Sequence, residues 1–189
     1  MNRVEIVMVA NGPGPKLAKA AVDAVKIDPK MDALISIGFC GGLQPSLGAC
    51  DIFVATEVNG VATLAPSSSR PFKTGKLLSM DRVVSTAAEK AALAENADAV
   101  EMEAAGVAAR AKQYYVAFYA VRVVTDTGDE EFSVDFNQMR SPDGRFSRAR
   151  IVAAALRRPR TIIPELMKLN KRTKRAAQAL GDFLADARF

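Results

Sequence analysis

Short continuous apolar runs, separated by helical stretches, restrict most strongly what this chain can fold into. The runs are apolar at successive positions, which is typical of strands covered on both faces of a sheet. Because strands and helices alternate, the sequence predicts an α/β fold of three layers, αβα, around a central mixed or mostly parallel sheet. The predicted strands are residues 4–10, 32–38, 52–56, 76–79, 98–102 and 115–125. The predicted helices are residues 16–25, 86–95, 151–156, 161–169 and 173–184, and residues 59–75 are predicted to be a loop.

Two carboxylates stand where a predicted strand ends and a predicted helix begins, in the segment Ala99–Gly106. Glu101 and Glu103 lie on either side of Met102, and alanines follow at once. Acidic residues in the first turn of a helix are favoured by the helix dipole, which accounts for one of the glutamates. The end of a buried strand is also where open α/β sheets bind ligands. The pattern therefore leaves two interpretations open, a plain helix start and a ligand site.

A third carboxylate, Asp126, follows the longest predicted strand. An aspartate in this position can cap a turn or a helix, or it can act as a catalytic carboxylate beside the two glutamates. The chain has no histidine, which excludes histidine-based triads and most transition-metal sites. Its two cysteines, Cys40 and Cys50, lack metal-ligand spacing, so no metal site is predicted. Acid–base chemistry is therefore left to carboxylates, Lys, Tyr or Cys.

Glycine-rich turns follow the first two predicted strands. After the first strand, Gly12 and Gly14 alternate with prolines and a helix follows. A strand–turn–helix arrangement can bind an anion on its backbone N–H groups, but proline has no N–H, and a plain turn is the alternative. After the second strand, Cys40 is followed by Gly41 and Gly42, which indicates a tight turn or a close approach of the backbone to another group.

Positive charge is concentrated in the C-terminal part of the chain. The net charge is +5, but residues 148–189 carry eleven Lys and Arg against three acidic residues, whereas residues 1–147 carry 15 basic and 18 acidic ones. We therefore divide the chain into an α/β domain, residues 1–147, and a basic helical extension, residues 148–189. Apolar residues recur every three or four positions over 162–169, so this helix can pack on the body or rest on an anionic membrane surface.

The same composition bears on location and partners. No nucleic-acid-binding motif accompanies the basic extension, so nucleic acid is not predicted as a partner. The sequence shows neither a signal-peptide profile nor an apolar run of membrane-spanning length. We therefore expect a cytoplasmic protein, with peripheral membrane contact through the extension as the alternative.

Several segments together resemble the superfamily of purine nucleoside phosphorylases and 5′-methylthioadenosine nucleosidases. In the family's order, and at about its spacing, they are Ser36–Leu43 with Gly48–Val54, Val100–Gly106 and Val121–Asp126. Later segments are similar to the short hopanoid-associated phosphorylases, which remove adenine from adenosylhopane. These segments are Phe136-Asn137, Ser141–Gly144 and Leu156–Pro159 with Pro164–Leu166.

The resemblance implies an enzyme that cleaves the N-glycosidic bond of a purine nucleoside, by phosphorolysis or by hydrolysis. It implies adenine as the base, a lipid nucleoside such as adenosylhopane as one candidate substrate, and a homo-oligomer. Inorganic phosphate would be the co-substrate of phosphorolysis, and no cofactor is implied. The alternatives are a purine-nucleoside-binding protein with impaired catalysis and an interaction module built on the basic extension.

The resemblance also assigns roles to particular residues. Asp126 would protonate the leaving base at N7, and burial at a strand end suits a carboxyl group to that task. Glu103 would bind the ribose hydroxyls, and Met102 would lie against the sugar. The other residues implied for substrate binding are Glu101, Val83, Val84, Phe39, Cys40 and Gly41, and those for phosphate or water are Gly12 and Gly14.

Three departures from the family's pattern accompany the resemblance. Relatives carry one more strand and turn ahead of the run over 4–10, so we expect a fold without the usual first strand and an incomplete nucleophile side. Phe39 stands where many relatives have serine, and Val83 where they often have a stacking phenylalanine. We therefore expect low activity on soluble adenosine analogues.

Overall fold

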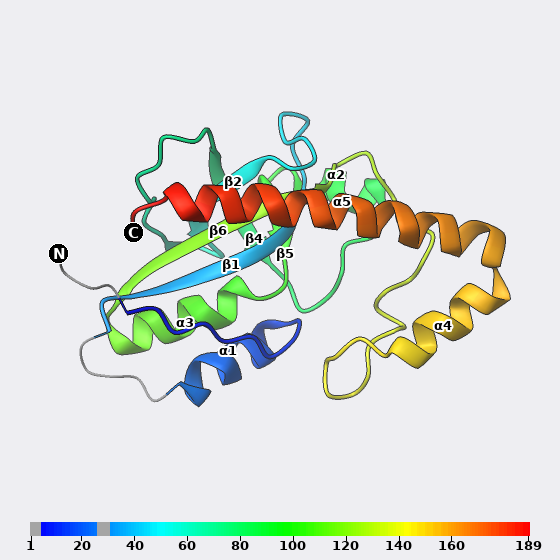
Figure 1. The fold of residues 1–189 in the computed structure, drawn as a ribbon, viewed down its shortest axis with the longest axis horizontal. Coiled ribbons are helices and arrows are strands. Elements are labelled where there is room, and N and C mark those ends of the chain that lie inside the picture. The colour runs from blue at the N-terminus through cyan, green and yellow to red at the C-terminus, as the bar shows by residue number, and fades with distance from the viewer. Residues whose placement is uncertain (1–4, 26–30) are drawn as a thin grey trace.

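The computed structural model describes residues 5–25 and 31–189 (Figure 1). Its strands are β1 (Ala33–Gly42), β2 (Ile52–Val58), β3 (Val61–Ala62), β4 (Lys73–Ser79), β5 (Ala99–Glu101) and β6 (Ala117–Asp126). Its helices are α1 (Pro15–Ala24), α2 (Ala87–Leu93), α3 (Ala104–Tyr114), α4 (Arg148–Arg157) and α5 (Pro159–Asp186).

The strands form a single mixed sheet in the order β3-β2-β4-β5-β1-β6. Strand β2 also pairs with β6, the last strand in this order, so strands β2, β4, β5, β1 and β6 form a closed ring of hydrogen-bonded neighbours. The pairs β1–β6, β2–β4 and β4–β5 are parallel, whereas β1–β5, β2–β3 and β2–β6 are antiparallel. Strand β1 lies between β5 and β6, with Gly41 opposite both Val100 and Asp126. This register brings the ends of β5 and β6 to the two sides of Gly41.

Alternate residues of the central strands face two different apolar cores. Phe53 and Ala120 pack in the core that contains Ala104, Ala108 and Ala111 of α3. The neighbouring residues of the same strands pack in a second core with α5; this core comprises Ile52, Val54, Val121 and Val123 with Ala176, Leu180 and Phe183. Figure 1 shows α1 and α3 on one side of the strands and α5 along the other. The three-layer α/β fold predicted from the sequence is confirmed.

The predicted first strand, residues 4–10, is wrong over the residues that the structure describes. Val4 lies outside them, and residues 5–10 have no strand pairing. Their apolar side chains are exposed, at 80% for Ile6 and 87% for Met8. Strand β5 pairs with β1 only at Gly41 and Gly42, so over residues 33–40 β1 is paired on one side alone, with β6. The run over 5–10 forms no ladder with the other edge, which shows that an apolar pattern without backbone pairing does not make a strand.

Other boundaries also differ from the prediction. The predicted loop over 59–75 contains β3 and the first residues of β4. The predicted C-terminal helices over 161–169 and 173–184 are one helix, α5, which begins at Pro159. Proline suits a first helical position because the missing N–H would have no partner within the helix. No helix in the described ranges combines the length and the apolar character needed to cross a bilayer.

Candidate functional site

The floor of the candidate site is a buried ion pair between Glu101, at the end of β5, and Arg122 on β6. Arg122 Nη2 donates to Glu101 Oε2 over 2.7 Å, and both side chains are almost fully buried. The other guanidinium donors bind Ser36 of β1, at 2.7 Å to its carbonyl oxygen and 2.8 Å to its hydroxyl. Arg122 therefore ties three neighbouring strands together beneath the site.

Glu101 also caps helix α3. Its carboxylate accepts the backbone N–H groups of Glu103, at 2.9 Å, and of Ala104, at 3.0 Å. Burial raises the pKa of Glu101, but the charge of Arg122 and the hydrogen bonds more than offset this, so the pKa lies below its ordinary value. The structure thus holds Glu101, which the sequence linked to substrate binding, as an anion among protein donors.

Glu103, two residues further on, is on the rim of the site. It occupies the N-cap position of α3, and its Oε1 accepts the backbone N–H of Gly14 over 3.1 Å. Burial and the negative charge of Glu101 raise the pKa of Glu103, against the opposing effect of the Gly14 N–H. The structure therefore joins two predicted site residues, and it makes Glu103 the carboxyl group that gains a proton more easily.

Gly14 is at a position that a larger residue could not occupy. Its φ is +102°, and an added Cβ would lie 2.8 Å from Asp81 Oδ1. Gly12, the other glycine of this turn, is exposed and lies beside Leu17 and Arg145. Of these two glycines, Gly14 therefore contacts a site carboxylate through its N–H, and Gly12 lies further out on the surface.

Asp126 lies at the end of β6 and is held by Lys90 of α2, a residue that the sequence analysis did not identify. Lys90 is completely buried, and its Nζ donates to Asp126 Oδ2 over 2.7 Å. Its other bonds go to the carbonyl oxygens of Thr127, at 2.8 Å, and Glu130, at 2.9 Å. The three donors of the ammonium are therefore all used. Thr125 Oγ1 donates to the second oxygen, Asp126 Oδ1, over 2.9 Å.

Helix α5 reaches the same strand end through Arg172. Arg172 donates to the carbonyl oxygen of Thr125 over 2.8 Å and binds both carboxylate oxygens of Glu130, one of them at 2.6 Å. The hydrogen bonds from Arg172 lower the pKa of Glu130. Because Glu130 also accepts Lys90 through its carbonyl, the basic helix and the Lys90–Asp126 pair share one loop.

The end of β1 supplies the next part of the site. Gly41 lies against Asp126, and an added Cβ there would be 2.9 Å from Oδ2. Cys40 is buried, and burial raises the pKa of its thiol far above the ordinary range, which disfavours the thiolate form. Phe39 points away from this core and is exposed.

The backbone of Val83 is already occupied by a side chain. Asn137 donates its amide to the Val83 carbonyl over 2.9 Å and accepts the Val83 N–H over 2.8 Å. Val84, which the resemblance implies for substrate binding, packs with Val100 in a small apolar cluster. Met102, two residues after Val100, is also buried. Asn137 was not among the site residues predicted from the sequence, because its partner is 54 positions away.

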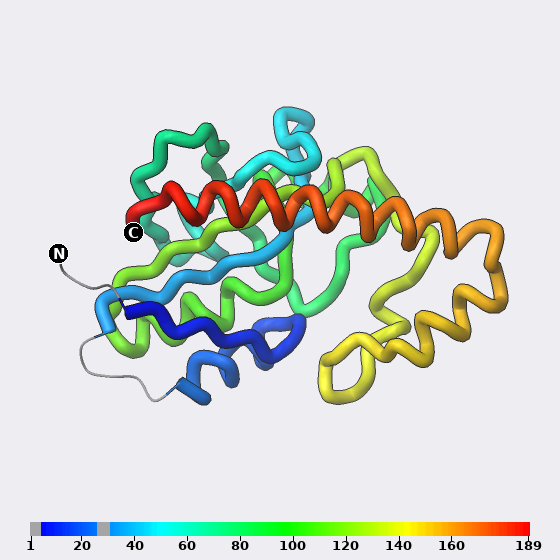
Figure 2. The backbone as a smooth tube through the Cα atoms, viewed as in Figure 1, coloured from blue at the N-terminus to red at the C-terminus, as the bar shows by residue number. Residues whose placement is uncertain are grey.

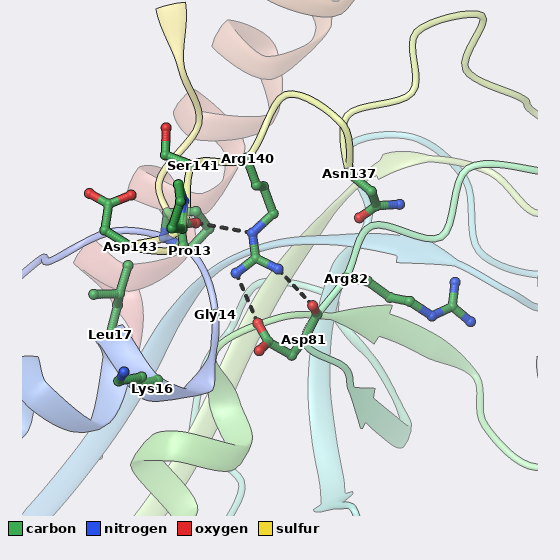
Figure 3. Close-up of a pocket in the computed structure, with 12 residues that line it drawn as sticks. Pro13, Gly14, Lys16, Leu17, Asp81, Arg82, Asn137, Arg140, Ser141 and Asp143 are labelled. Carbon is green, nitrogen blue, oxygen red and sulfur yellow. Dashed lines mark hydrogen bonds and ion pairs between the residues drawn. The ribbon is translucent and has the colours of Figure 1, made fainter.

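A cavity of about 350 Å³ opens beside the rim (Figure 3). It lies between residues 13–17, 81–82 and 137–144, and Gly14 is the predicted site residue that lines it. Figure 3 shows the Arg140 guanidinium across this opening, where Nη2 donates to Asp81 Oδ1 over 2.9 Å and Nε to the Gly144 carbonyl over 3.0 Å. Arg140, like Lys90 and Asn137, was not predicted from the sequence.

The described residues contain no group of three or more His, Cys, Asp or Glu placed to hold a metal ion. What the arrangement can do follows from its groups. It offers one carboxyl group that burial disposes towards protonation, Glu103, and two carboxylates in buried ion pairs, Glu101 and Asp126. Proton transfer and the binding of hydroxyl groups are the chemistry open to such a set.

Comparisons with known proteins agree with this fold. A family model described as "Phosphorylase superfamily" matches residues 59–157. The native futalosine hydrolase of Helicobacter pylori aligns over 93% of this chain and 75% of its own, with 17% identity and a TM-score of 0.62. A 5′-methylthioadenosine/S-adenosylhomocysteine nucleosidase from Colwellia psychrerythraea, solved with adenine, aligns over 62% and 63%, with 24% identity and a TM-score of 0.51. The corresponding nucleosidase of Campylobacter jejuni aligns over 68% and 70%, with 20% identity and a TM-score of 0.54.

Proposed function

The chain belongs to the phosphorylase superfamily, and from that premise we propose that it cleaves the N-glycosidic bond of a purine nucleoside. The observation that carries the proposal is the placing of Asp126 and of the Glu101–Glu103 turn. Asp126 is the last residue of β6, and the glutamate turn begins at the last residue of β5; these two strands flank Gly41 of β1. Carboxylates on the two sides of Gly41 can act on the two halves of a nucleoside, the base and the sugar.

The chemistry of the bond suits these two groups. Cleavage leaves negative charge on the base and positive charge on the sugar. In its protonated form Asp126 would give its proton to N7 of the base and become a carboxylate, and Lys90 and Thr125 would hold that carboxylate in place. Glu103 would bind the ribose hydroxyls, and its charge would stabilise the cationic sugar as it develops.

We propose adenine as the base, in line with the structural neighbour that was solved with adenine. Adenosylhopane, and with it a role in hopanoid biosynthesis, is a narrower proposal that depends on the similarity of residues 136–166 to the hopanoid-associated phosphorylases. The nucleophile is water or phosphate. The Gly14 N–H, which the resemblance implies for either, donates to Glu103 and therefore does not select between them. A homo-oligomer remains part of the proposal.

One observation favours a second function, binding of a purine nucleoside without turnover. Both oxygens of Asp126 already accept hydrogen bonds, one of them from the fully buried Lys90 ammonium. To reach a base, the Asp126 carboxyl group would have to exchange one of these partners for N7. A chain that cannot make this exchange would bind its ligand and leave the bond intact.

The test is release of free base from adenosine, inosine and 5′-methylthioadenosine, with and without phosphate. We expect adenine as the product, and the sugar product distinguishes phosphorolysis from hydrolysis. Asp126→Asn should lower kcat by ~10²–10⁴-fold, the usual contribution of general acid catalysis. Asp129→Asn removes an exposed carboxylate three residues away and should leave the rate unchanged. Tight binding without base release would establish the second function, and neither binding nor release would refute both.

A further inference from the structure

Helices α4 and α5 form a hairpin that leaves the body of the protein, and we propose that this hairpin docks on the surface of an anionic lipid bilayer. The hairpin is defined here as residues 148–175. Figure 2 shows α4 and the first half of α5 extending beyond the sheet. Docking of this kind would hold whether or not the site cleaves a nucleoside.

The charge of the hairpin is the first observation. Residues 148–175 contain ten Lys and Arg and one acidic residue, Glu165. Lys168 and Arg172 pair with Glu130 of the body. Six further basic side chains, from the end of α4 through α5, are exposed; they are Arg157, Arg158, Arg160, Lys171, Lys174 and Arg175. A surface with this excess of positive charge attracts a negatively charged surface.

Exposed apolar side chains among these charges are the second observation. Helix α4 has no buried residue, and its Leu156 is 75% exposed. Met167 of α5 is 68% exposed, and Val152 and Ile163 are exposed as well. Met167 also lines a shallow hollow of about 520 Å³ together with Lys168, Asn170, Lys171 and Lys174. Large apolar side chains gathered on one part of a surface mark an interaction site.

The helical period places these groups on one side of α5. The inner side carries Ile162, Ala176 and Leu180, which are buried. Ile163 and Met167 are four positions apart and lie on the outer side, and Lys171 and Lys174 continue the same stripe at intervals of four and three residues. An outer stripe of apolar and basic residues is typical of helices that lie in the membrane interface, where the apolar groups enter the acyl boundary and the basic ones reach the phosphates.

The two observations together select a lipid surface among the partners that positive charge could attract. The phosphate backbone of a nucleic acid would account for the basic residues and not for exposed Leu156 and Met167. A second copy of the chain could cover the apolar groups, but it would bring two strongly basic hairpins together. An anionic bilayer supplies both a negative surface and an apolar layer beneath it.

The experiment is co-sedimentation of the full chain with vesicles, in the absence of any nucleoside. Vesicles of phosphatidylcholine with phosphatidylglycerol are compared with vesicles of phosphatidylcholine alone, at low and high salt. We expect binding to the anionic vesicles that weakens as salt screens the charges. Lys171→Glu with Lys174→Glu should reduce it by at least ~25-fold, since each basic charge near the surface contributes about 1 kcal/mol. Leu156→Ser with Met167→Ser should reduce binding while leaving the charge unchanged.

The matched control is Arg70→Glu with Lys112→Glu, which makes the same change of charge on exposed residues outside the hairpin. It should lower vesicle binding much less than the lysine pair in the hairpin. Equal binding to both vesicle types, or an equal loss in the control, would overturn the proposal. So would capture by single-stranded RNA that survives the Leu156→Ser/Met167→Ser change, or a dimer that this change dissociates. The melting temperature of each variant, compared with the parent, shows that the fold is retained.

Discussion

The floor and the rim of the site each contain a glutamate from the same turn, and the two behave in opposite ways. Glu101 of the floor is bound by Arg122 and by the first N–H groups of α3, and its pKa lies below the ordinary value. Glu103 of the rim accepts one N–H, from Gly14, and its pKa lies above the ordinary value, because of burial and the charge of Glu101. The pKa values of two identical side chains thus shift in opposite directions, because Arg122 forms its ion pair with Glu101 and not with Glu103.

The comparison suggests how a superfamily site can be built on a buried anion. Glu101 with Arg122 fixes three strands and the start of α3, so it is committed to the protein. Glu103 sits on the rigid turn that results and keeps oxygen lone pairs for another partner. The floor therefore supplies stability, and the rim supplies the group that is free to act.

The largest effect is expected from a substitution that removes the buried ion pair of the floor. Arg122→Met should lower the free energy of unfolding by about 3–5 kcal/mol, because it leaves the Glu101 carboxylate buried without its partner. Denaturant unfolding followed by circular dichroism measures this. Arg110→Met, which removes an ion pair with Asp23 at the surface, is the control and should change little.

A second replacement sharpens this result. With Arg122→Met and Glu101→Gln together, no charge is left unpaired and the amide oxygen can still accept the N–H groups of α3, so much of the lost stability should return. If Arg122→Met is no more harmful than Arg110→Met, the floor is not held by this pair, and the contrast between the two glutamates needs another cause.

A smaller effect is expected at the second buried ion pair, between Lys90 and Asp126. Lys90→Met should lower stability by roughly 1–3 kcal/mol, the cost of leaving a buried polar group without its partner. The Asp126 side chain is less deeply buried than that of Glu101, at 9% against 1% exposed, so the loss should be smaller than at the floor. Lys112→Met, at an exposed position of α3, is the control.

Lys90→Met and Asp126→Asn should not be additive. In a double-mutant cycle, residues that share an ion pair show an interaction energy of ~0.5–3 kcal/mol. A sum of the single effects within error would mean that the two side chains act independently, contrary to the 2.7 Å contact.

The sequence predicted the sheet and the junction of β5 with α3 because both depend on local patterns of apolar residues. It also held a signal for the floor, since Arg122 interrupts the longest apolar strand and an arginine there requires a buried anion. Lys90 gave no such signal, because a lysine in a short helix is usually at the surface. Its partners, at positions 126, 127 and 130, are close to it only in the fold.

The incorrect first strand has a related cause. The apolar run over 4–10 shows which backbone conformation its side chains favour, but a strand forms only where the backbone pairs with a neighbour, and over 5–10 no such pairing occurs. The same holds for Asn137 and Arg140, whose contacts with Val83 and Asp81 cross more than fifty residues of sequence. Site residues that act through long-range contacts therefore have to be found in the structure.

The smallest expected effect has the opposite sign from the others. Since the pKa of Glu103 is raised in the folded state, its ionisation opposes folding. The stability linked to its protonated form is complete below the ordinary value of 4.5 and is lost as the pH rises through the folded-state pKa. Glu103→Gln cannot ionise, and its carbonyl oxygen can still accept the Gly14 N–H. The variant should therefore be more stable than the parent at pH 7, by about 1 kcal/mol or less, which corresponds to roughly 2–4 °C in Tm at this chain length.

Thermal unfolding of Glu103→Gln and Glu101→Gln across the range from about pH 4 to 7 sharpens the comparison of rim and floor. The gain in Glu103→Gln should shrink on acidification, as the parent's Glu103 takes up its proton. Glu101→Gln should be less stable than the parent at pH 7. Its deficit should narrow as the pH falls, because a lowered pKa contributes stability that is present above 4.5 and lost below the folded-state pKa. Differences of the same sign at pH 7 would mean that Arg122 does not separate the two glutamates, and that the rim carboxyl group is as firmly held as the one beneath it.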